Sequence, residues 1–186
     1  MKISIYLASG LAVTALIVGV VFGYYLTSDY KISMYDKTSM DLGPADRTFD
    51  LRYINAMITH HRGAMFLAEQ LQKNASRQEM KDLAGAILKD EPAAIAELYA
   101  WKKDWYKDTK IVRDPIVAQL GSADEKFELR FLNAIIAHHE AGILMTQETR
   151  LKSTRSEILN NAEAVETFLS GGIKMLKEFR KNWYNL

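Results

Sequence analysis

The fold of this chain is decided by the stretch INAMITHHRGAM at residues 54–65, which returns in altered form as LNAIIAHHEAGI at residues 132–143. The two stretches contain all 4 histidines of the protein, arranged as two adjacent pairs. A motif that recurs at a fixed spacing is typical of a chain built from repeated structural units. The extent of the repeat therefore indicates the architecture to expect.

The repeat extends well beyond the histidine pairs. Asp46 recurs as Asp124, an offset of 124 − 46 = 78 residues, and this offset holds without a gap to the end of the chain. Each unit carries apolar residues at three- and four-residue steps, such as Phe49, Tyr53 and Leu67 in the first, which is the spacing of a helix face. No segment alternates with a period of two, so no sheet is expected.

The sequence thus predicts an all-α fold of the ferritin-like kind, an antiparallel four-helix bundle formed by two duplicated helical hairpins, residues 46–108 and 122–186. The helices are expected to break around residues 74–76 and 153–154. A serine followed three residues later by a glutamate is the pattern of a capping box. This pattern predicts helix starts at two places, Ser76 with Glu79 and Ser122 with Glu125.

The N-terminal region has the composition of a membrane segment. Ile3 to Ser28 contains no charged side chain, and it is longer than the roughly 20 residues that cross a bilayer. Lys2 and the amino terminus precede this run, which favours a cytoplasmic N-terminus. The sequence predicts an uncleaved transmembrane helix within residues 1–28, a tether over residues 29–45 and a bundle over residues 46–186 in the periplasm or outside the cell. A cleaved signal peptide and a secreted form are the alternative.

Composition excludes several classes of function. The formal net charge is +1 and the charges are mixed along the chain, so there is no basic face for nucleic acid. Cysteine is absent, which excludes disulfides, thiolate metal sites and cysteine nucleophiles. No Glu-x-x-His motif is present, which argues against di-iron carboxylate chemistry. No pairing of a nucleophile with a base stands out either, so the sequence does not predict an enzyme.

The two histidine pairs are the candidate metal ligands. Neighbouring residues on a helix point about 100° apart, so one member of each pair is expected to face the core and the other a neighbouring helix. Concentrating every histidine of the chain at equivalent places of two repeats favours a shared metal site. The four predicted ligands are His60, His61, His138 and His139.

Two methionines and one glutamate complete the candidate site. Met57 and Met65 lie four residues before and after His61, so the three side chains can form a ladder along one helix face. Imidazole with thioether sulfur favours copper, whereas oxygen ligands such as Glu91 would suit zinc or Cu(II). The predicted cargo is therefore a metal ion, with copper favoured and zinc possible.

The alternative is a buried polar layer that fixes helix register without any metal. Its expected partners for the imidazoles are Asn55, Asn133, Arg52 and Arg130. The predicted function is a membrane-anchored metal-binding protein that buffers or delivers copper outside the cytoplasm without turnover. A structural or protein-interaction bundle is the second interpretation, and the sequence identifies no protein partner.

The stretch MITHHRGA at residues 57–64 resembles a known signature, Met-Ile-Pro-His-His-x-x-Ala, of the family called domain of unknown function 305 (DUF305). Thr59 replaces the proline, while Asp46, Phe49 and Trp101 also fit the family pattern. Residues 135–139 are a second, looser copy. The resemblance implies a four-helix bundle that is often exported or membrane-tethered in bacteria, and some members of the family are linked to copper handling.

The resemblance also points to the second helix of each hairpin. Family members tend to carry Gln and then Glu in the helix before the tryptophan. Glu91 and Ala94 occupy those positions in the first unit, and Leu169 and Gly172 occupy them in the second. The two units therefore depart from the family pattern in different ways.

Overall fold

The computed structural model describes residues 41–186, so the predicted membrane segment and most of the predicted tether lie outside the described residues. The described part contains four helices and no strand: α2 (Phe49–Asn74), α3 (Gln78–Tyr106), α4 (Phe127–Lys152) and α5 (Ser156–Tyr184). Each bound of α4 and α5 lies 78 residues after the corresponding bound of α2 and α3, as His138 follows His60. The prediction of an all-α fold with four helices is confirmed. Among residues 41–186, no helix combines the length and the apolar character that a bilayer crossing needs.

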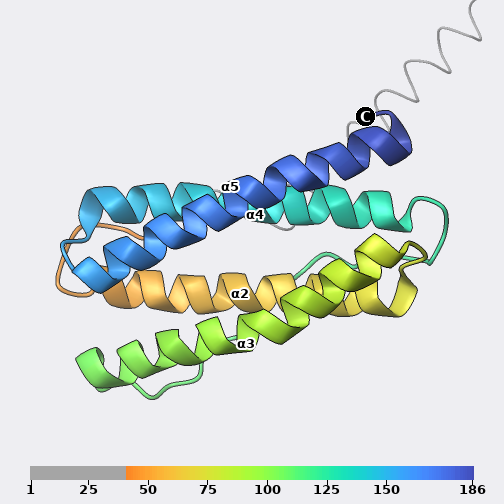
Figure 1. The fold of residues 1–186 in the computed structure, drawn as a ribbon. Helices are drawn as coiled ribbons and strands as arrows, with labels where there is room; N and C mark the ends of the chain where they lie inside the picture. The colour runs from red at the N-terminus through yellow and green to blue at the C-terminus, as the bar shows by residue number, and fades with distance from the viewer. Residues whose placement is uncertain (1–40) are drawn as a thin grey trace, which may run out of the picture.

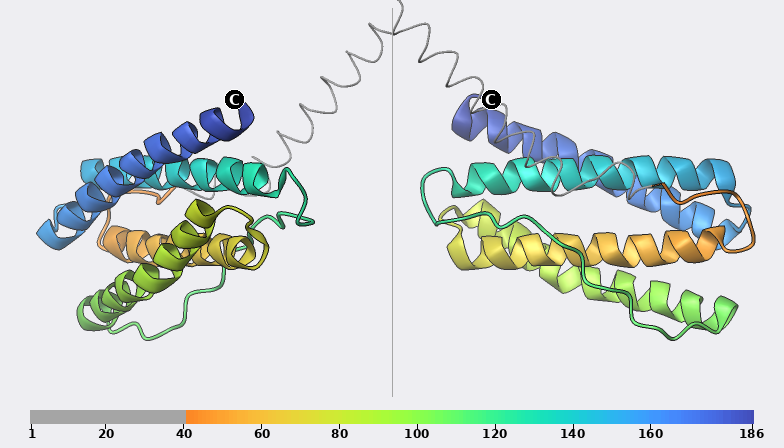
Figure 2. Two further views of the ribbon diagram at one scale, coloured as in Figure 1. Left: turned by 45° about the vertical axis from the view of Figure 1, so that its right-hand side comes forward. Right: turned by 180° about the vertical axis from the view of Figure 1, so that it is seen from behind.

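The helices form two layers. α2 packs against α3, α4 against α5, and the two hairpins meet chiefly through α2 and α4. Figure 1 shows α2 and α4 side by side, with α3 and α5 crossing them obliquely on one side of this pair. Seen from behind, α2 and α4 form the near layer, and the connection from α3 to α4 runs across α2 (Figure 2). The central pair is thus α2 and α4, and α3 and α5 are the outer helices.

The burial pattern explains this division. In α5 the buried apolar residues form one narrow stripe at helical spacing, Ile158, Ala162, Leu169 and Leu176. In α4 the buried residues occupy most of the circumference, because that helix contacts both α5 and α2. A helix with a single apolar stripe is stable at the surface of a fold, whereas one buried on most sides belongs in its centre.

Two apolar clusters fill the two ends of the molecule. One cluster includes α2 from Ala64 onward and α4 as far as Ile136. The other includes α2 as far as Ile58 and α4 from Met145. On both central helices the histidines lie between these clusters. The imidazoles therefore form a polar layer across the middle of an otherwise apolar core.

A carboxylate from each hairpin holds the turn of the other. The Glu128 carboxylate of α4, 4% exposed, accepts hydrogen bonds from the Ser76 amide at 2.8 Å, the Arg77 amide at 2.9 Å and the Arg77 guanidinium. At the equivalent place in the other repeat, Asp50 of α2 accepts a hydrogen bond from the Ser153 hydroxyl at 2.7 Å. Each turn is therefore tied to the first helix of the opposite hairpin.

The predicted capping boxes are wrong. α3 begins after Arg77 and α4 begins after Lys126, and neither of these residues caps its helix through a side chain. The Ser76 hydroxyl donates instead to Glu128 at 3.1 Å. A buried carboxylate from a distant helix satisfies the exposed amides of the turn, which a local serine was expected to do.

The packed structure begins before the predicted start of the bundle. Leu42 is 4% exposed and belongs to a core cluster, although it falls within the segment predicted as a tether. The Arg52 guanidinium donates to the carbonyls of Leu42 and Pro44. In the second unit Arg130 donates in the same way to the carbonyl of Leu120. The repeat therefore starts four residues earlier, with a buried leucine in front of each unit.

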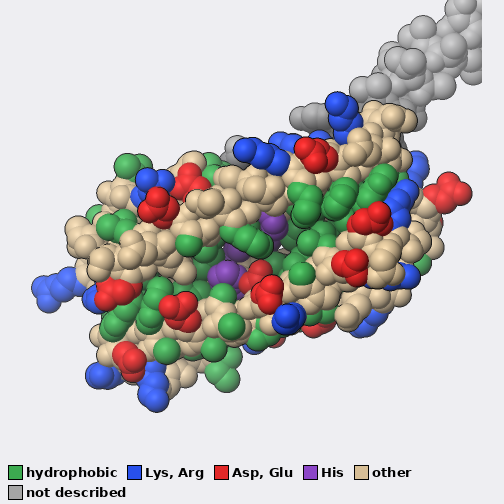
Figure 3. All heavy atoms as spheres, in the orientation of Figure 1, with side chains coloured by type: hydrophobic (Ala, Val, Ile, Leu, Met, Phe, Trp, Pro, Cys, Tyr) green, Lys and Arg blue, Asp and Glu red, His purple; other side chains and the backbone are tan. Residues whose placement is uncertain are grey.

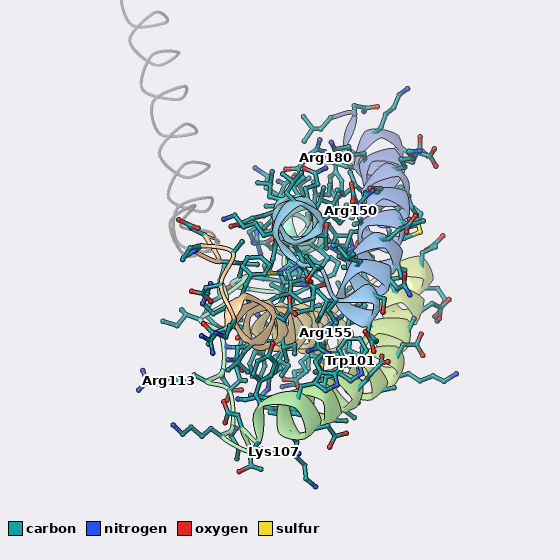
Figure 4. All side chains as sticks on the ribbon, turned by 90° about the vertical axis from the view of Figure 1, so that its left-hand side faces the viewer. Trp101, Lys107, Arg113, Arg150, Arg155 and Arg180 are labelled. Atoms are coloured by element: carbon teal, nitrogen blue, oxygen red, sulfur yellow. The ribbon has the colours of Figure 1, made fainter. Side chains whose placement is uncertain are left out.

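The outer helices are fastened at their ends. The Arg155 guanidinium, just before α5, lies 4.2 Å from the centre of the Trp105 ring of α3. Arg77, just before α3, lies 4.7 Å from the centre of the Trp183 ring of α5. Figure 4 shows Arg155 and Trp101 together at the end of the molecule where α5 begins and α3 ends. Cation–π contacts between the hairpins thus hold both ends of the two outer helices.

Candidate metal centre

The histidine pairs from the two hairpins meet at the contact between α2 and α4. The rings of His60 and His138 are stacked, with 3.8 Å between their centres and 18° between their planes. Nε2 of His60 lies 3.1 Å from the backbone carbonyl oxygen of His138. The centres of adjacent rings are 6.1 Å apart for His60 and His61 and 6.2 Å apart for His138 and His139. The imidazoles of both repeats therefore belong to one layer.

A glycine makes room for one of these rings. A Cβ atom at Gly142 of α4 would lie 2.5 Å from Nε2 of His60 and 2.5 Å from Cδ1 of Leu169. Real Cβ atoms do not approach other atoms so closely, and an alanine there would displace the imidazole. Only glycine lets the His60 ring rest on the backbone of α4 in this position. The sequence analysis did not identify Gly142, although its place four residues after His138 was a usable signal.

His61 faces the outer helix α3. Its Nδ1 forms a short contact with the carboxylate of Glu91, and the two side chains are 12% and 16% exposed. Since a carboxylate can only accept, Nδ1 of His61 carries the donated proton. The carboxylate of α3 and the imidazole of α2 thus orient each other near the middle of the first hairpin.

These contacts decide which ring nitrogens keep a lone pair. The His138 carbonyl accepts a proton from Nε2 of His60, so in the neutral ring the lone pair is on Nδ1. In neutral His61 the lone pair is on Nε2, because Nδ1 donates to Glu91. Both of these atoms, and Nδ1 of His139, are buried and have no hydrogen-bond partner. Buried polar atoms are normally paired, so unpaired nitrogens of this kind fit a site for a cation.

Burial keeps the imidazoles neutral. Removal from water lowers the pKa of His60 to about 3 and the pKa of His139 to about 4. Burial, followed by the neighbouring imidazoles, also holds the pKa of His138 well below its usual value. A neutral imidazole is the form that binds a metal ion. His60, His138 and His139 are therefore neutral and ready for a ligand role at neutral pH.

The two methionines of the candidate site lie in different surroundings. Met57 is completely buried in the apolar cluster that also contains Tyr53 and Ile58. Met65 is half-buried on α2. The arginines expected in a polar layer have other roles, because Arg52 and Arg130 bind the segments that precede α2 and α4. The partners of the imidazoles include the backbone carbonyl of His138, which contacts His60, and the Glu91 carboxylate, which contacts His61.

Asn133, another expected member of that polar layer, has a different partner as well. Its side-chain oxygen accepts a hydrogen bond from the Arg180 guanidinium of α5 at 3.0 Å. The side-chain oxygen of Asn55, its counterpart in the first repeat, is buried without a hydrogen-bond partner. The asparagines therefore add polar atoms to the core but do not account for the histidine contacts described above.

The side chains that could bind a metal ion do not gather into a group of three or more around one point. Within residues 41–186, no three side chains of His, Asp, Glu or Cys are grouped so that they could hold one metal ion. Structural zinc sites are normally tetrahedral and closed, so the arrangement does not offer one. A pair of imidazole nitrogens, with or without a thioether, suits a soft ion with few ligands.

The layer can be reached from one face of the molecule. In Figure 3 histidine side chains are visible in a hollow between the two outer helices, surrounded mainly by hydrophobic side chains. The surface pocket between α2 and the connection from α3 to α4 is a different feature, lined among others by Phe66, Pro115 and Ile116. An ion would therefore reach the imidazoles through the face between α3 and α5.

The fold and the histidine layer define a class of protein: two helical hairpins that enclose paired imidazoles in an apolar core. Residues 50–116 match the family described as "Domain of unknown function (DUF305)", so the family resemblance predicted from the sequence is confirmed. No curated protein matches the chain significantly.

Solved structures of the protein CopM are similar to this chain. The structure titled "CopM in the Cu(I)-bound form" has 27% sequence identity and a TM-score of 0.65, and the match covers 73% of this chain and 97% of that one. "CopM in the apo form" gives 27% identity, a TM-score of 0.65, and coverage of 73% and 98%. "CopM in the Cu(II)-bound form" gives 25% identity, a TM-score of 0.62, and coverage of 73% and 97%.

Proposed function

We propose that this protein binds copper at the histidine layer and stores, buffers or delivers the ion without catalysing a reaction. The observation that carries the proposal is the set of buried imidazole nitrogens that have no hydrogen-bond partner: Nδ1 of His60, Nε2 of His61 and Nδ1 of His139. The similarity to copper-bound forms of CopM supports copper as the ion. The candidate ligands are His60, His61, His138 and His139, with Met57, Met65 and Glu91 as further donors.

The test is a metal titration of the full-length chain in detergent micelles, with Cu(I), Cu(II) and Zn(II) compared separately. We expect micromolar or tighter binding of copper and weaker binding of zinc. A double variant, His60→Ala with His61→Ala, is expected to lose the tight site. Gly171→Ala is a suitable control, since a Cβ atom there meets nothing within 4 Å. Absence of copper binding at millimolar concentrations would rule the proposal out.

A second candidate function is a structural or interaction bundle whose histidines only fix helix register. The stacking of His60 on His138 and the hydrogen bond between them favour this reading, because they tie α2 to α4 at one level. It predicts that loss of the imidazoles lowers thermal stability while added copper leaves the melting temperature unchanged.

We also propose that residues 1–28 anchor the chain to a membrane, that residues 29–45 begin the connection to the bundle, and that the bundle lies outside the cytoplasm. The uncharged run from Ile3 to Ser28 supports this placement. The chain should remain in the membrane pellet after alkaline carbonate extraction, and protease added outside spheroplasts should digest the bundle. Recovery of a mature chain that starts after residue 28 in the soluble fraction would instead indicate a cleaved signal peptide.

A further inference from the structure

The two repeats differ at the position of the outer helix that, in the first hairpin, contacts the second histidine of the pair. In the first hairpin, Glu91 of α3 accepts the Nδ1 proton of His61. The residue 78 positions later, at the same place of α5, is Leu169, which is 4% exposed. A leucine side chain has no acceptor, so the second hairpin lacks this carboxylate. The sequence repeat is therefore broken at the position whose side chain, in the first hairpin, determines which ring nitrogen of His61 carries the proton.

The rings of the second histidines also face different surroundings. A Cβ atom at Gly172 of α5 would lie 3.0 Å from both Cδ2 and Nε2 of His139. This edge of the His139 ring therefore rests on the backbone of α5, which leaves little space for an ion beside Nε2. Nε2 of His61 is buried and has no hydrogen-bond partner. Nε2 is thus free to face an ion in His61 but covered in His139, where the nitrogen without a hydrogen-bond partner is Nδ1.

A carboxylate on the far nitrogen of a metal-binding histidine has a known physical effect. It fixes the tautomer and the ring orientation, and it makes the nitrogen that faces the metal more basic. Among the contacts of His61 described here, Glu91 has the geometry for this role. The pair is only 12% and 16% exposed, so water screens the interaction poorly.

We infer that the two repeats are not equivalent: the first pair, His60 and His61, forms the tight copper site, and Glu91 is the positioning residue that prepares His61 for it. This inference rests on the proposed function. His138 of the second pair supplies the ring against which the His60 imidazole stacks. The chain would accordingly bind one tightly held copper ion although its sequence contains two histidine pairs.

The test compares matched variants of the full-length chain in detergent micelles, titrated with Cu(I) against a chromophoric chelator. Glu91→Leu gives the first hairpin the residue of the second, and we expect it to weaken binding about 10- to 100-fold. Glu91→Gln keeps an acceptor for the Nδ1 proton and should retain much of the affinity. His61→Asn should abolish the tight site, whereas His139→Asn should weaken it much less.

A second readout needs no copper. Long-range ¹⁵N–¹H correlation spectra of the metal-free chain should show the His61 proton on Nδ1, and Glu91→Leu should shift the ring toward the other tautomer. A residue that only supports the fold would change neither the tautomer nor the order of affinities. Circular dichroism confirms that each variant is folded before it is compared.

The outcomes separate this inference from the proposed function. If the unmodified chain binds no copper, the proposed function fails and the inference fails with it. If the unmodified chain binds copper but His139→Asn weakens the tight site as strongly as His61→Asn, the inference alone is overturned. The same holds if Glu91→Leu has no effect on affinity, or if His61 carries its proton on Nε2 in the metal-free chain.

Discussion

The imidazoles determine how the stability of this protein depends on pH. His60 and His139 have pKa values lowered by burial to about 3 and about 4, whereas a histidine in an unfolded chain titrates near 6.5. Between these values the unfolded chain binds protons that the folded chain does not, so stability decreases as pH falls. The contribution of neutral imidazoles is complete above about pH 6.5 and is lost as pH falls toward 4 and below.

We therefore expect the free energy of unfolding to decrease between about pH 7 and about pH 5, before most carboxylates begin to titrate. Urea denaturation of the metal-free chain at several pH values measures the effect. Replacing His139 by asparagine should flatten the dependence, since one of the buried imidazoles is then gone. A free energy that stays constant over this range would contradict the buried, neutral histidine layer.

Gly142 gives a test of the packing around His60. An alanine there would push the imidazole away from the α4 backbone and compress Leu169, because both lie 2.5 Å from the added Cβ. Overpacking of this kind costs about 1–3 kcal/mol, more than the gain in helix propensity of up to about 1 kcal/mol. We expect Gly142→Ala to lower the melting temperature.

Gly171→Ala serves as the matched control for Gly142→Ala. No atom lies within 4 Å of a Cβ at Gly171, so only the gain in helix propensity should remain. Its melting temperature should rise or stay unchanged. A stabilised Gly142→Ala variant would show that the His60 ring does not rest on α4 as described.

The sequence identified the four histidines and Glu91 as candidate residues, but not the contacts that they form. Adjacent histidines on a helix must point in different directions, which a sequence can predict. The stacking of His60 on His138 depends on how closely α2 and α4 approach, and Gly142 in the other repeat leaves the space that the His60 ring occupies. Contacts of this kind depend on tertiary packing and are not encoded in local spacing.

At the scale of elements, the turns are the points where the hairpins depend on each other. Glu128 is buried, and its carboxylate accepts hydrogen bonds from Ser76 and Arg77. Removing a buried acceptor leaves the amides of the turn unpaired, which typically costs about 1–3 kcal/mol, and the half-exposed Arg77 can turn to water. We expect Glu128→Ala to destabilise the protein by about this amount, measured by urea denaturation.

Asp50 provides the comparison for Glu128. It holds the other turn through Ser153 and Arg155, but its side chain is 16% exposed, against 4% for Glu128. Water can replace part of its hydrogen bonding, so Asp50→Ala should cost less than Glu128→Ala. Equal losses at the two positions would show that burial does not decide the strength of these links.

The helix bounds agree closely with the sequence pattern, whereas the capping residues do not. The break expected around residues 74–76 lies between the end of α2 at Asn74 and the start of α3 at Gln78. Hydrophobic periodicity is a signal summed over many residues, so it locates a helix well. A cap is decided by one hydrogen bond, and here Glu128, distant in sequence, replaced the local serine. Leu42 and Leu120 also obey the 78-residue repeat and are buried, but they precede the units expected from the sequence.

At the scale of the whole molecule, bound copper should stabilise the fold if the site is real. A ligand that binds only the native state adds about 2.7 kcal/mol of stability at a free concentration of 100 times its Kd. We expect Cu(I) to raise the melting temperature of the unmodified chain and to leave that of the His60→Ala/His61→Ala variant unchanged. Equal shifts in the two proteins would indicate that copper binds elsewhere.

The overall architecture was predictable, but the angles at which the helices cross were not. A repeat of two amphipathic hairpins predicts that they bury their apolar faces against each other. Periodicity does not say at what angle the hairpins cross, because crossing angles depend on which ridges and grooves of the helices meet. In this protein α2 and α4 form most of the contact, and the outer helices cross them obliquely (Figure 1).

The guanidinium–indole contacts at the ends of α3 and α5 affect how fast a bound metal ion could be exchanged. Arg77 with Trp183 and Arg155 with Trp105 hold the outer helices at points remote from the imidazoles. The nitrogens that would bind an ion are buried between these fixed ends, so the side chains that cover them must move before an ion enters or leaves. The rate of release to an acceptor would then depend on this local movement as well as on the strength of the metal–nitrogen bonds.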